Sequence, residues 1–330
     1  MKKIFIVCFL LIPLFLFAGK KEIAEELVHE GVKLHEAGSY KSAIEKYKEA
    51  LELDKNNLRA NYEIAYSYSA IGEYVLAIEY ADKVINAKSN NMDLAYTVKA
   101  NCLDMIGDRE DAIKVYNEAL KLFPDNNLLY YNLALTYLNM KKVPEAEKTV
   151  ITALQKNPMH SGSHLLLSQI MLKQNKRLKS MLAIYNFLIL EPDSKRSANA
   201  LKLLKNLASS GVKTEEDKTT LQVGSNDIKD DFSAAELAVS ASKNTAENKN
   251  LPEERIFYKN TQSLFKILGE TKKENKGFWW DFYVNFYYEI VKQDNVEALC
   301  YYISSTSKSE SIKKWLTSNK GKIVRFTTWL

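Results

Sequence analysis

The chain contains a repeat of thirty-four residues, and this repeat constrains its fold more than any other feature. Pro124, Pro158 and Pro192 follow one another at that interval. A common pattern of small and large residues precedes each proline and is clearest in the segment YTVKANCLDMIGDREDAIKVYNEALKLFP, which ends at Pro124. A fixed period of this length predicts stacked units that share one continuous core, because a single unit cannot bury its own apolar faces.

The pattern continues through five units from residue 22 to about residue 194, over half of the chain, and the array with a final capping helix spans residues 22–207. Four units keep the small and large positions. The fifth is degenerate, with Ser168 and Ser180 at small positions and Phe187 in place of an alanine. Units one and two are marked by Leu27, Gly31, Leu34, Gly38, Ala43, Tyr47 and Ala50, and by Ile64, Ala65, Tyr68, Gly72, Ala77 and Ala81. Units three and four are marked by Tyr96, Ala100, Leu103, Gly107, Ala112, Tyr116 and Ala119, and by Tyr130, Leu133, Ala134, Tyr137, Ala146 and Ala153.

This pattern resembles the tetratricopeptide repeat, in which each unit is a pair of antiparallel helices. The resemblance implies an all-α solenoid of about five helix-turn-helix units. Small residues such as Gly31 and Ala43 allow the two helices of a unit to approach closely, and large residues such as Tyr47 fill the gaps between neighbouring helices. Proline ends the second helix, because it lacks an N–H group and disfavours helical geometry just before it. Residues 197–207 fit the capping helix that ends such arrays.

By resemblance to the family, the fifth and ninth residues of each unit line a concave groove. The fifth positions hold Val28, Tyr62, Thr97, Tyr131 and Leu165, and the ninth positions hold Val32, Tyr66, Asn101, Leu135 and Gln169. Some family members bind a partner's C-terminal carboxylates with lysine and asparagine at such positions. That lysine set is absent here, so we do not expect a carboxylate clamp.

Tyrosine side chains in the groove offer rigid contact area, and amide side chains bind a peptide backbone. We therefore predict that an extended or helical segment of another protein docks in the groove. The predicted contact residues are Tyr62, Tyr66, Thr97, Asn101, Tyr131, Leu135 and Gln169. The alternative is that several of the tyrosines pack between helices inside the array.

The first eighteen residues have the layout of a secretory signal, with Lys2 and Lys3, a short apolar run and a small-residue exit at Ala18. The apolar run is shorter than the roughly 20 residues that a membrane-spanning helix needs. The sequence thus predicts export from a bacterial cell to the periplasm or beyond, with an uncleaved anchor as the alternative. No transmembrane span is expected after removal of the signal.

The composition changes twice after the array. Residues 208–250 are rich in Ser, Thr, Asn, Asp, Glu and Lys, which predicts a flexible polar linker with a short helix in its second half. Residues 251–330 contain all four tryptophans and are predicted to form a small helical bundle. Its central helix would be FWWDFYVNFYYEIV, residues 278–291, with a polar stripe at Asp281, Asn285, Glu289 and Lys292.

The aromatic helix of the bundle is interpreted first as core, since large rings fill a small domain efficiently. A membrane-surface helix is an alternative, although its polar stripe is not basic. A ligand or glycan platform is another, because adjacent Trp279 and Trp280 cannot both lie on one line of a helix. In that case one of the two rings would be an exposed second surface.

The sequence carries little sign of catalysis or of a bound group. Four histidines are present, and the pair His160 and His164 lacks further metal ligands at ordinary spacing. There is no glycine-rich phosphate loop and no nucleophile motif. Cys102 and Cys300 form no disulfide framework, although one bridge between them remains open. The net charge of +5, spread over the chain, argues against a nucleic-acid partner.

These features together predict a non-enzymatic interaction scaffold of the bacterial envelope, without cofactor, metal or catalytic residues. Its partner would be a protein or peptide segment, with an envelope or glycan component as a second one. The alternative function is a glycan- or cell-wall-binding protein whose specificity lies in the C-terminal aromatic domain.

Overall fold

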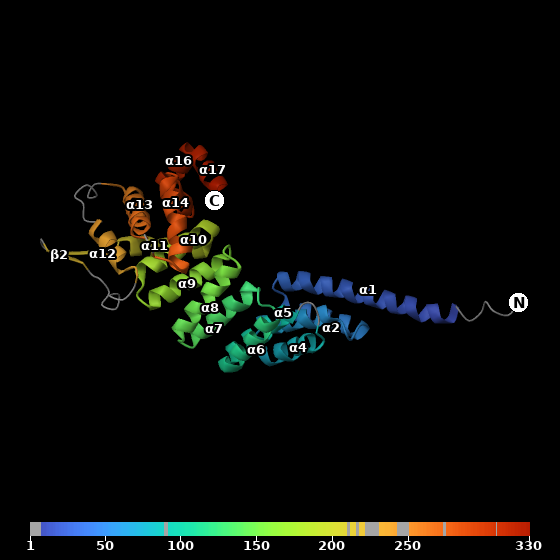
Figure 1. Cartoon of the computed structure of the whole chain (residues 1–330). Coiled ribbons are helices and arrows are strands. Elements are labelled where there is room, and N and C mark those ends of the chain that lie inside the picture. Colours follow the sequence, from blue (N-terminus) through green and yellow to red (C-terminus); the bar gives the residue numbers. More distant parts are fainter. Residues whose placement is uncertain are drawn as a thin grey trace. The chain divides into compact units, whose positions relative to one another are not determined.

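The computed structural model of the 330-residue chain describes residues 8–88, 92–209, 212–215, 218–221, 231–242, 251–272, 275–307 and 309–330. Side chains are described from residue 19 onward, apart from those of the two strands and of Ser242. The chain divides into two compact units, Met1–Lys141 and Lys142–Leu330 (Figure 1).

The predicted signal peptide, residues 1–18, lies outside the described side chains. Within the part of the chain that is described, no helix combines the length and the apolar character needed to cross a bilayer.

Unit 1 consists of antiparallel helical pairs, as the repeat predicts. Its helices are α1 (Cys8–Glu36), α2 (Tyr40–Leu53), α3 (Leu58–Ala70), α4 (Tyr74–Asn86), α5 (Met92–Ile106), α6 (Arg109–Leu122) and α7 (Asn127–Asn139). Fully buried alanines lie at the small positions, among them Ala43, Ala65 and Ala112. The all-α solenoid predicted from the sequence is therefore confirmed in these residues.

The turn inside each repeat uses a left-handed backbone position at the same place. Gly38, Gly72 and Gly107 have φ values of 77°, 82° and 98°. Lys141 and Asn175 take the equivalent positions in the fourth and fifth repeats, with φ values of 59° and 58°. Glycine adopts this region without strain, and a residue here closes the helix by a hydrogen bond across the turn.

Gly31 is required by the close approach of Tyr47. A Cβ atom at residue 31 would lie only 2.3 Å from a ring carbon of Tyr47, which is itself fully buried. Gly31 lies on α1 and Tyr47 on α2, so the missing side chain of one helix accommodates the ring of the other. Gly19, also on α1, has no atom within 4 Å of the equivalent Cβ position.

The variant Gly31→Ala should destabilise unit 1, since the new methyl group displaces the Tyr47 ring. We expect a loss of about 1–3 kcal/mol in the free energy of unfolding, as is typical of overpacked cores. Urea unfolding of the full chain, followed by circular dichroism, measures it. Gly19→Ala is the matched control on the same helix and should be neutral; an equal effect of both variants would contradict this explanation.

Asparagine side chains join consecutive repeats of unit 1. Asn57 caps α3 by accepting a hydrogen bond from the Ala60 N–H group, and its amide donates to Glu25 Oε1 on α1 at 2.7 Å. Asn126 caps α7 and its amide donates to Asp93 Oδ2 on α5 at 2.9 Å. One side chain thus satisfies a helix end and contacts the preceding repeat.

Unit 2 contains the last repeat helices together with the C-terminal region. It comprises α8 (Val143–Lys156), α9 (Ser161–Lys173), α10 (Arg177–Leu190), α11 (Lys195–Ser209), β1 (Val212–Glu215), β2 (Lys218–Leu221), α12 (Ser233–Ser242), α13 (Glu253–Thr271), the π-helix η3 (Trp279–Val284), α14 (Asn285–Lys292), α15 (Val296–Ile303), α16 (Glu310–Ser318) and α17 (Lys320–Trp329). The predicted capping helix is present as α11. The two short strands form an antiparallel pair inside the segment predicted to be a linker.

Helix α10 is buried around its whole circumference, with every residue from 178 to 189 buried. It contacts α9 and α11 on the repeat side and α15 and η3 on the C-terminal side. The C-terminal helices consequently share a core with the last repeat. The predicted separate bundle beyond a linker differs from this arrangement, because Lys142–Leu330 forms one compact unit.

Buried tyrosine hydroxyls fix the contact between α10 and the C-terminal helices. Tyr287 donates to the Leu182 carbonyl at 2.8 Å and accepts from Asn186 Nδ2 at 2.9 Å. The Tyr185 hydroxyl is 2.7 Å from Thr261 Oγ1. Burial raises the pKa of both tyrosines well above its usual value. Hydrogen bonds that satisfy buried hydroxyls also restrict the contact to one geometry.

Helix α12 shows that part of the predicted linker is packed. Its Glu236 carboxylate pairs with Arg177 Nε of α10 at 2.5 Å. The preceding Asp231 accepts hydrogen bonds from Lys179 Nζ and from the indole of Trp280. Phe232 is buried, with its ring centroid 4.5 Å from that of Trp280. The short helix predicted in the linker is therefore present and attached to unit 2.

His164 is a fully buried histidine between α9 and η3. Its Nε2 lies 2.8 Å from the Pro158 carbonyl oxygen and must carry the proton, since that oxygen only accepts. Its Nδ1 then accepts from the Tyr283 hydroxyl at 2.6 Å. Burial lowers the pKa of His164 to about 4, so the ring is neutral at physiological pH.

Unit 2 should therefore lose stability as the pH falls from about 6.5 to about 4. The unfolded chain binds a proton at His164 in that range and the folded chain does not, which lowers the free energy of unfolding by about 2 kcal/mol at a pH of about 5. His164→Gln can keep both hydrogen bonds without titrating. Thermal unfolding at several pH values should show a shallower acid dependence for that variant; parallel curves would contradict the assignment.

Candidate functional site

The candidate site is one face of the first helices of unit 1, which we name the aromatic face. It consists of His35 on α1, Tyr62 and Tyr66 on α3, Thr97 and Asn101 on α5, and Tyr131 and Leu135 on α7. The two predicted residues on each helix are four apart, so they lie on the same side of it. The aromatic face belongs wholly to unit 1.

Three aromatic rings form a ladder on this face. The Tyr66 ring is stacked on His35 at a centroid distance of 4.7 Å and an interplanar angle of 20°. Tyr62 and Tyr66 are parallel within 7° at 6.2 Å. Tyr66 is 46% exposed although its neighbours are half-buried. The ladder is thus preorganised and still open to a ligand.

His35 is held in place by its neighbours. Its Nδ1 is 2.7 Å from Ser67 Oγ, and its ring meets the edge of Tyr40 at 4.9 Å. Burial lowers the pKa of His35, so the ring is neutral at neutral pH. Sequence reasoning missed this residue because only the fifth and ninth positions were considered. His35 lies three residues after Val32, one further turn along the same side of α1.

The α5 part of the face is polar. The Thr97 hydroxyl donates to the Asp93 carbonyl oxygen at 2.8 Å, and the Thr97 side chain is half-buried. Asn101 Oδ1 accepts from the Tyr116 hydroxyl at 2.5 Å. The Asn101 side chain is exposed, and its amide nitrogen has no partner among the described residues. That nitrogen is a free donor for a ligand carbonyl.

Other predicted groove residues behave in different ways. Tyr131 and Leu135 on α7 are half-buried. Val28 is fully buried in the core of the first repeat and does not line a groove. Gln169, on α9 of unit 2, is exposed, and Leu165 on the same helix is half-buried. The α9 side that carries Gln169 is therefore not covered by the C-terminal helices.

The aromatic face is accompanied by carboxylates. Glu63, beside Tyr62 on α3, is half-buried, and burial raises the pKa of its side chain. Asp104 on α5 is neutralised locally by Arg109 Nε at 2.8 Å and also accepts from Thr136 and Asn139. Burial, with Glu63, Tyr66 and Asp93 nearby, raises the pKa of Tyr62 to about 12. The Tyr62 phenol is thus neutral, and the charge around it is negative.

The predicted second surface at Trp279 and Trp280 is not exposed. Trp279 is 8% exposed and Trp280 is 1% exposed. The segment is a π-helix, in which residues five apart are hydrogen bonded, so adjacent rings can both turn inward. The alternative prediction that one ring is available for stacking is wrong, and the first interpretation of this helix as core is confirmed. The predicted polar stripe at Asp281, Asn285, Glu289 and Lys292 is exposed.

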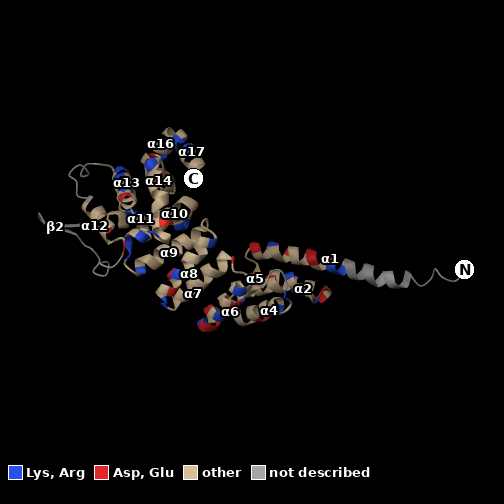
Figure 2. Ribbon diagram, viewed as in Figure 1, with Lys and Arg blue, Asp and Glu red and all other residues tan. Residues whose placement is uncertain are grey.

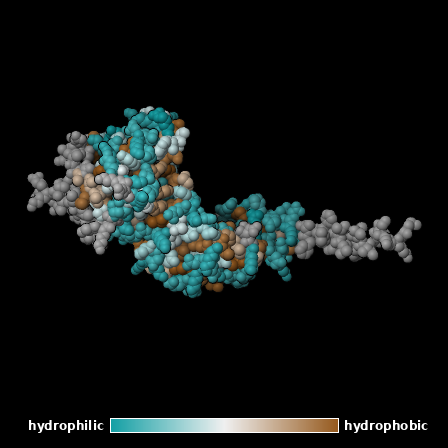
Figure 3. Space-filling view, in the orientation of Figure 1, coloured by the Kyte–Doolittle hydropathy of each residue, from teal (hydrophilic) through white to brown (hydrophobic). Residues whose placement is uncertain are grey.

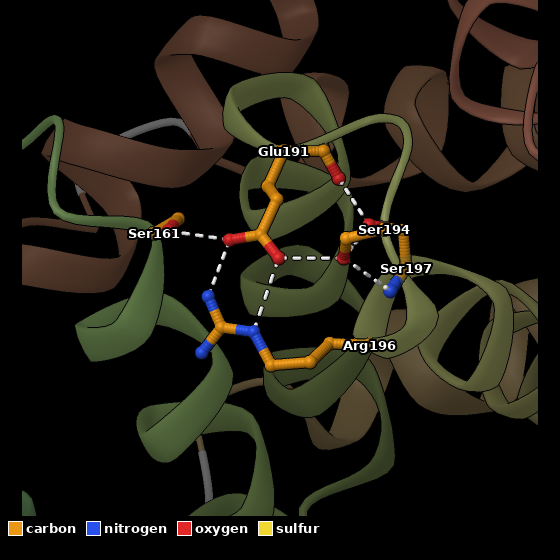
Figure 4. A network of polar contacts seen from close by, with 5 residues as sticks. All are labelled: Ser161, Glu191, Ser194, Arg196 and Ser197. Carbon is orange, nitrogen blue, oxygen red and sulfur yellow. Dashed lines mark hydrogen bonds and ion pairs between the residues drawn. The ribbon is translucent and has the colours of Figure 1, made fainter. Parts of the chain in front are cut away.

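A polar network in unit 2 joins the ends of α9, α10 and α11 (Figure 4). The Glu191 carboxylate accepts from Ser161 Oγ at 3.0 Å, from Ser194 Oγ at 2.6 Å and from the Arg196 guanidinium. The guanidinium of Arg196 is the main reason that the pKa of Glu191 is lowered to about 2. Each oxygen of the Glu191 carboxylate accepts two hydrogen bonds within the network, which identifies it as a structural joint.

The described residues contain no group of His, Cys, Asp and Glu side chains arranged to hold a metal ion. Cys102 and Cys300 are buried free thiols. Burial raises the pKa of both, to about 12 for Cys300, so neither is a reactive thiolate at neutral pH. The arrangement supports binding and provides no constellation for catalysis among these residues.

Comparison with protein-family models finds tetratricopeptide repeats in three segments. Residues 107–170 and 58–91 match models described as "Tetratricopeptide repeat", and residues 31–72 match a model described as "TPR repeat". None of these three matches extends beyond residue 170. The repeats recognised from the sequence pattern are thus found independently.

Curated relatives match part of the chain. A TPR repeat-containing protein of Methanocaldococcus jannaschii is 32% identical over 117 residues, 34% of this chain and 19% of the relative. The BBSome complex member BBS4 of Bos taurus is 24% identical over 150 residues, 46% of this chain and 28% of the relative. The chain therefore spans less than a third of the length of either relative.

Among solved structures, PilF of Pseudomonas aeruginosa is similar in fold. The superposition has a TM-score of 0.50 at 22% sequence identity and covers 58% of this chain and 85% of that chain. At this identity the likeness concerns the fold alone.

Proposed function

The repeat region of this chain belongs to the tetratricopeptide-repeat family, and we propose that the chain docks a segment of a partner protein on the aromatic face of unit 1. Its tetratricopeptide-repeat relatives indicate a protein–protein interaction scaffold. The docking position and the cellular location are parts of the proposal. We further propose that the chain acts as an exported scaffold of a bacterial envelope.

The ring ladder of His35, Tyr62 and Tyr66 is the observation that carries the docking proposal. An exposed tyrosine on a rigid helix usually has no stacked support, whereas Tyr66 is fixed by a ring contact and remains 46% exposed. Rigid aromatic anchors lose little conformational entropy on binding and dominate many interfaces. The neighbouring Asn101 amide adds a donor that can bind a peptide backbone.

The triple variant Tyr62→Ala/Tyr66→Ala/Tyr131→Ala and the single variant Tyr66→Ala test the docking site. Peptides selected from a displayed library on the full chain should lose at least about tenfold in affinity to both variants, since anchors of this kind are worth about 1.4 kcal/mol or more. Affinity is measured by isothermal titration calorimetry. Circular dichroism verifies that the helices are retained.

A matched control uses exposed apolar residues elsewhere in unit 1. Val75 on α4 is 71% exposed and Leu122 on α6 is 53% exposed, and neither lies on the aromatic face. Val75→Ala/Leu122→Ala should bind the selected peptides unchanged. An equal loss in the control, or no loss in Tyr66→Ala, would move the docking site away from this face.

The proposed export predicts which residue forms the N-terminus of the mature protein. If residues 1–18 are a cleaved signal, the protein purified from its native cell should begin at Gly19, after the small residue Ala18. Intact-mass spectrometry of the envelope fraction measures this directly. A protein that retains Met1 and partitions with membranes would show an uncleaved anchor instead.

The alternative function as a glycan-binding protein loses its structural basis. It required an exposed ring at Trp279 or Trp280, and both are buried.

A further inference from the structure

The two parts of the chain differ in charge. Residues 20–141 carry 15 Lys and Arg against 20 Asp and Glu, a net charge of −5, whereas residues 142–330 carry 29 against 21, a net charge of +8. The unit that bears the aromatic face is therefore acidic, with Asp and Glu visible along α1, α2 and α6 (Figure 2). The overall charge of +5 conceals this difference. An acidic surface attracts cationic partners.

The negative charge also reaches the ring ladder itself. Glu63 and Tyr66 are three residues apart on α3, so their side chains are neighbours on the helix surface. Glu63 is half-buried and has no hydrogen bond or ion pair with any other described residue. The charge of Arg59 opposes the effect of burial on the pKa of Glu63, and the charge of Glu36, next to His35, adds to the effect of burial to a smaller extent. A half-buried carboxylate without a partner is costly, and a ligand cation would remove that cost.

The basic residues nearby form no ion pair with this carboxylate among the described residues. Arg59, one turn before Glu63, pairs with Glu25 of α1 at 3.4 Å. His35 is neutral at neutral pH, because burial lowers its pKa. The hydroxyl groups of Tyr62 and Tyr66 likewise have no partner among the residues that the structure describes. The site therefore combines electron-rich rings with a free carboxylate.

The chemistry of the aromatic face is both aromatic and acidic. On the face of the molecule seen in Figure 3, hydrophobic residues alternate with hydrophilic ones and do not form one continuous patch. Aromatic rings beside an unpaired carboxylate match a side chain that has an apolar stem and a cationic end. Lysine and arginine have this form, and their cations bind both ring faces and carboxylates.

We propose that the aromatic face recognises a lysine- or arginine-bearing segment of the partner protein, whose cation packs against the Tyr62–Tyr66 rings and pairs with Glu63. This inference rests on the proposed function and specifies the partner's chemistry. The acidic charge of unit 1 draws the segment in, the rings take the stem of the cationic side chain, and Glu63 fixes its end.

Synthetic peptides test the charge requirement directly on the full chain. The probes are acetylated and amidated decapeptides of Gly, Ser and Leu with a single central Arg, Lys, citrulline or Glu. Citrulline has the shape of arginine without its charge. At low ionic strength, fluorescence anisotropy should show at least about fivefold tighter binding of the Arg and Lys peptides than of the citrulline peptide. The difference should shrink as salt is added.

Glu63→Gln should abolish the preference for Arg and Lys over citrulline, because it removes the charge and keeps the shape. Glu79→Gln on α4 is the matched control, since Glu79 is exposed and off the aromatic face. It should leave the preference unchanged. Equal binding of all four peptides, or a preference that survives Glu63→Gln, would overturn the inference.

The failure of this inference can be told apart from failure of the docking site. If all four peptides bind equally and Tyr66→Ala abolishes that binding, the aromatic face remains the docking site but has no selectivity for a cation. Binding of no peptide, or binding indifferent to Tyr66→Ala, overturns both. The chain is also tested for self-association. If it self-associates and Glu63→Gln abolishes that association, the cation belongs to a second copy of the chain, and the assignment to a separate partner is overturned.

Discussion

The packing of a small residue on one helix against a large residue on the next is the contact on which the whole repeat region depends. The same pair of positions recurs in unit 1 as Gly31 with Tyr47 and Ala100 with Tyr116, and all four residues are buried. Because the small position has little or no side chain, the helices of a pair approach closely. Close pairs can stack in register, and this stacking places the fifth and ninth repeat positions of α3, α5 and α7 on one face, with His35 of α1 beside them.

At the end of the array, the apolar surface of the last helical pair is covered by helices that are not repeats. An exposed last repeat would leave the apolar helix α10 facing water. The C-terminal helices cover it, and tyrosine hydroxyls from Tyr185 and Tyr287 satisfy the polar groups at this contact. Serines at the degenerate small positions are satisfied locally, since Ser168 donates to the Leu165 carbonyl and Ser180 to the Ser168 carbonyl. The fifth repeat departs from the pattern because its second helix, α10, is covered by the C-terminal helices and not by a further repeat.

The sequence predicts the repeat helices well, since their period repeats several times and each copy supports the others. It predicts less where a feature occurs once. The apolar run at residues 181–190 indicates a helix buried on all sides, yet it does not reveal which helices cover it. Trp279 and Trp280 were expected to diverge on an α-helix, and the π-helix that buries both has no local sequence signature. Val28 holds a groove position by register, although in α1 that position faces the core.

The face of unit 1 was predicted in part for the same reason. Register alone places Tyr62 and Tyr66 on one side of α3, but the ring contact of Tyr66 with His35 joins two repeats and depends on their packing. Glu63 shows no special feature in the sequence; its half-burial without a partner is visible only in the structure. A shared solenoid fold at 22% identity therefore says little about what is bound. Selectivity in the proposed docking would come from the few side chains that the shared packing leaves accessible, and on the aromatic face of this chain these include the exposed Tyr66 and the half-buried Glu63.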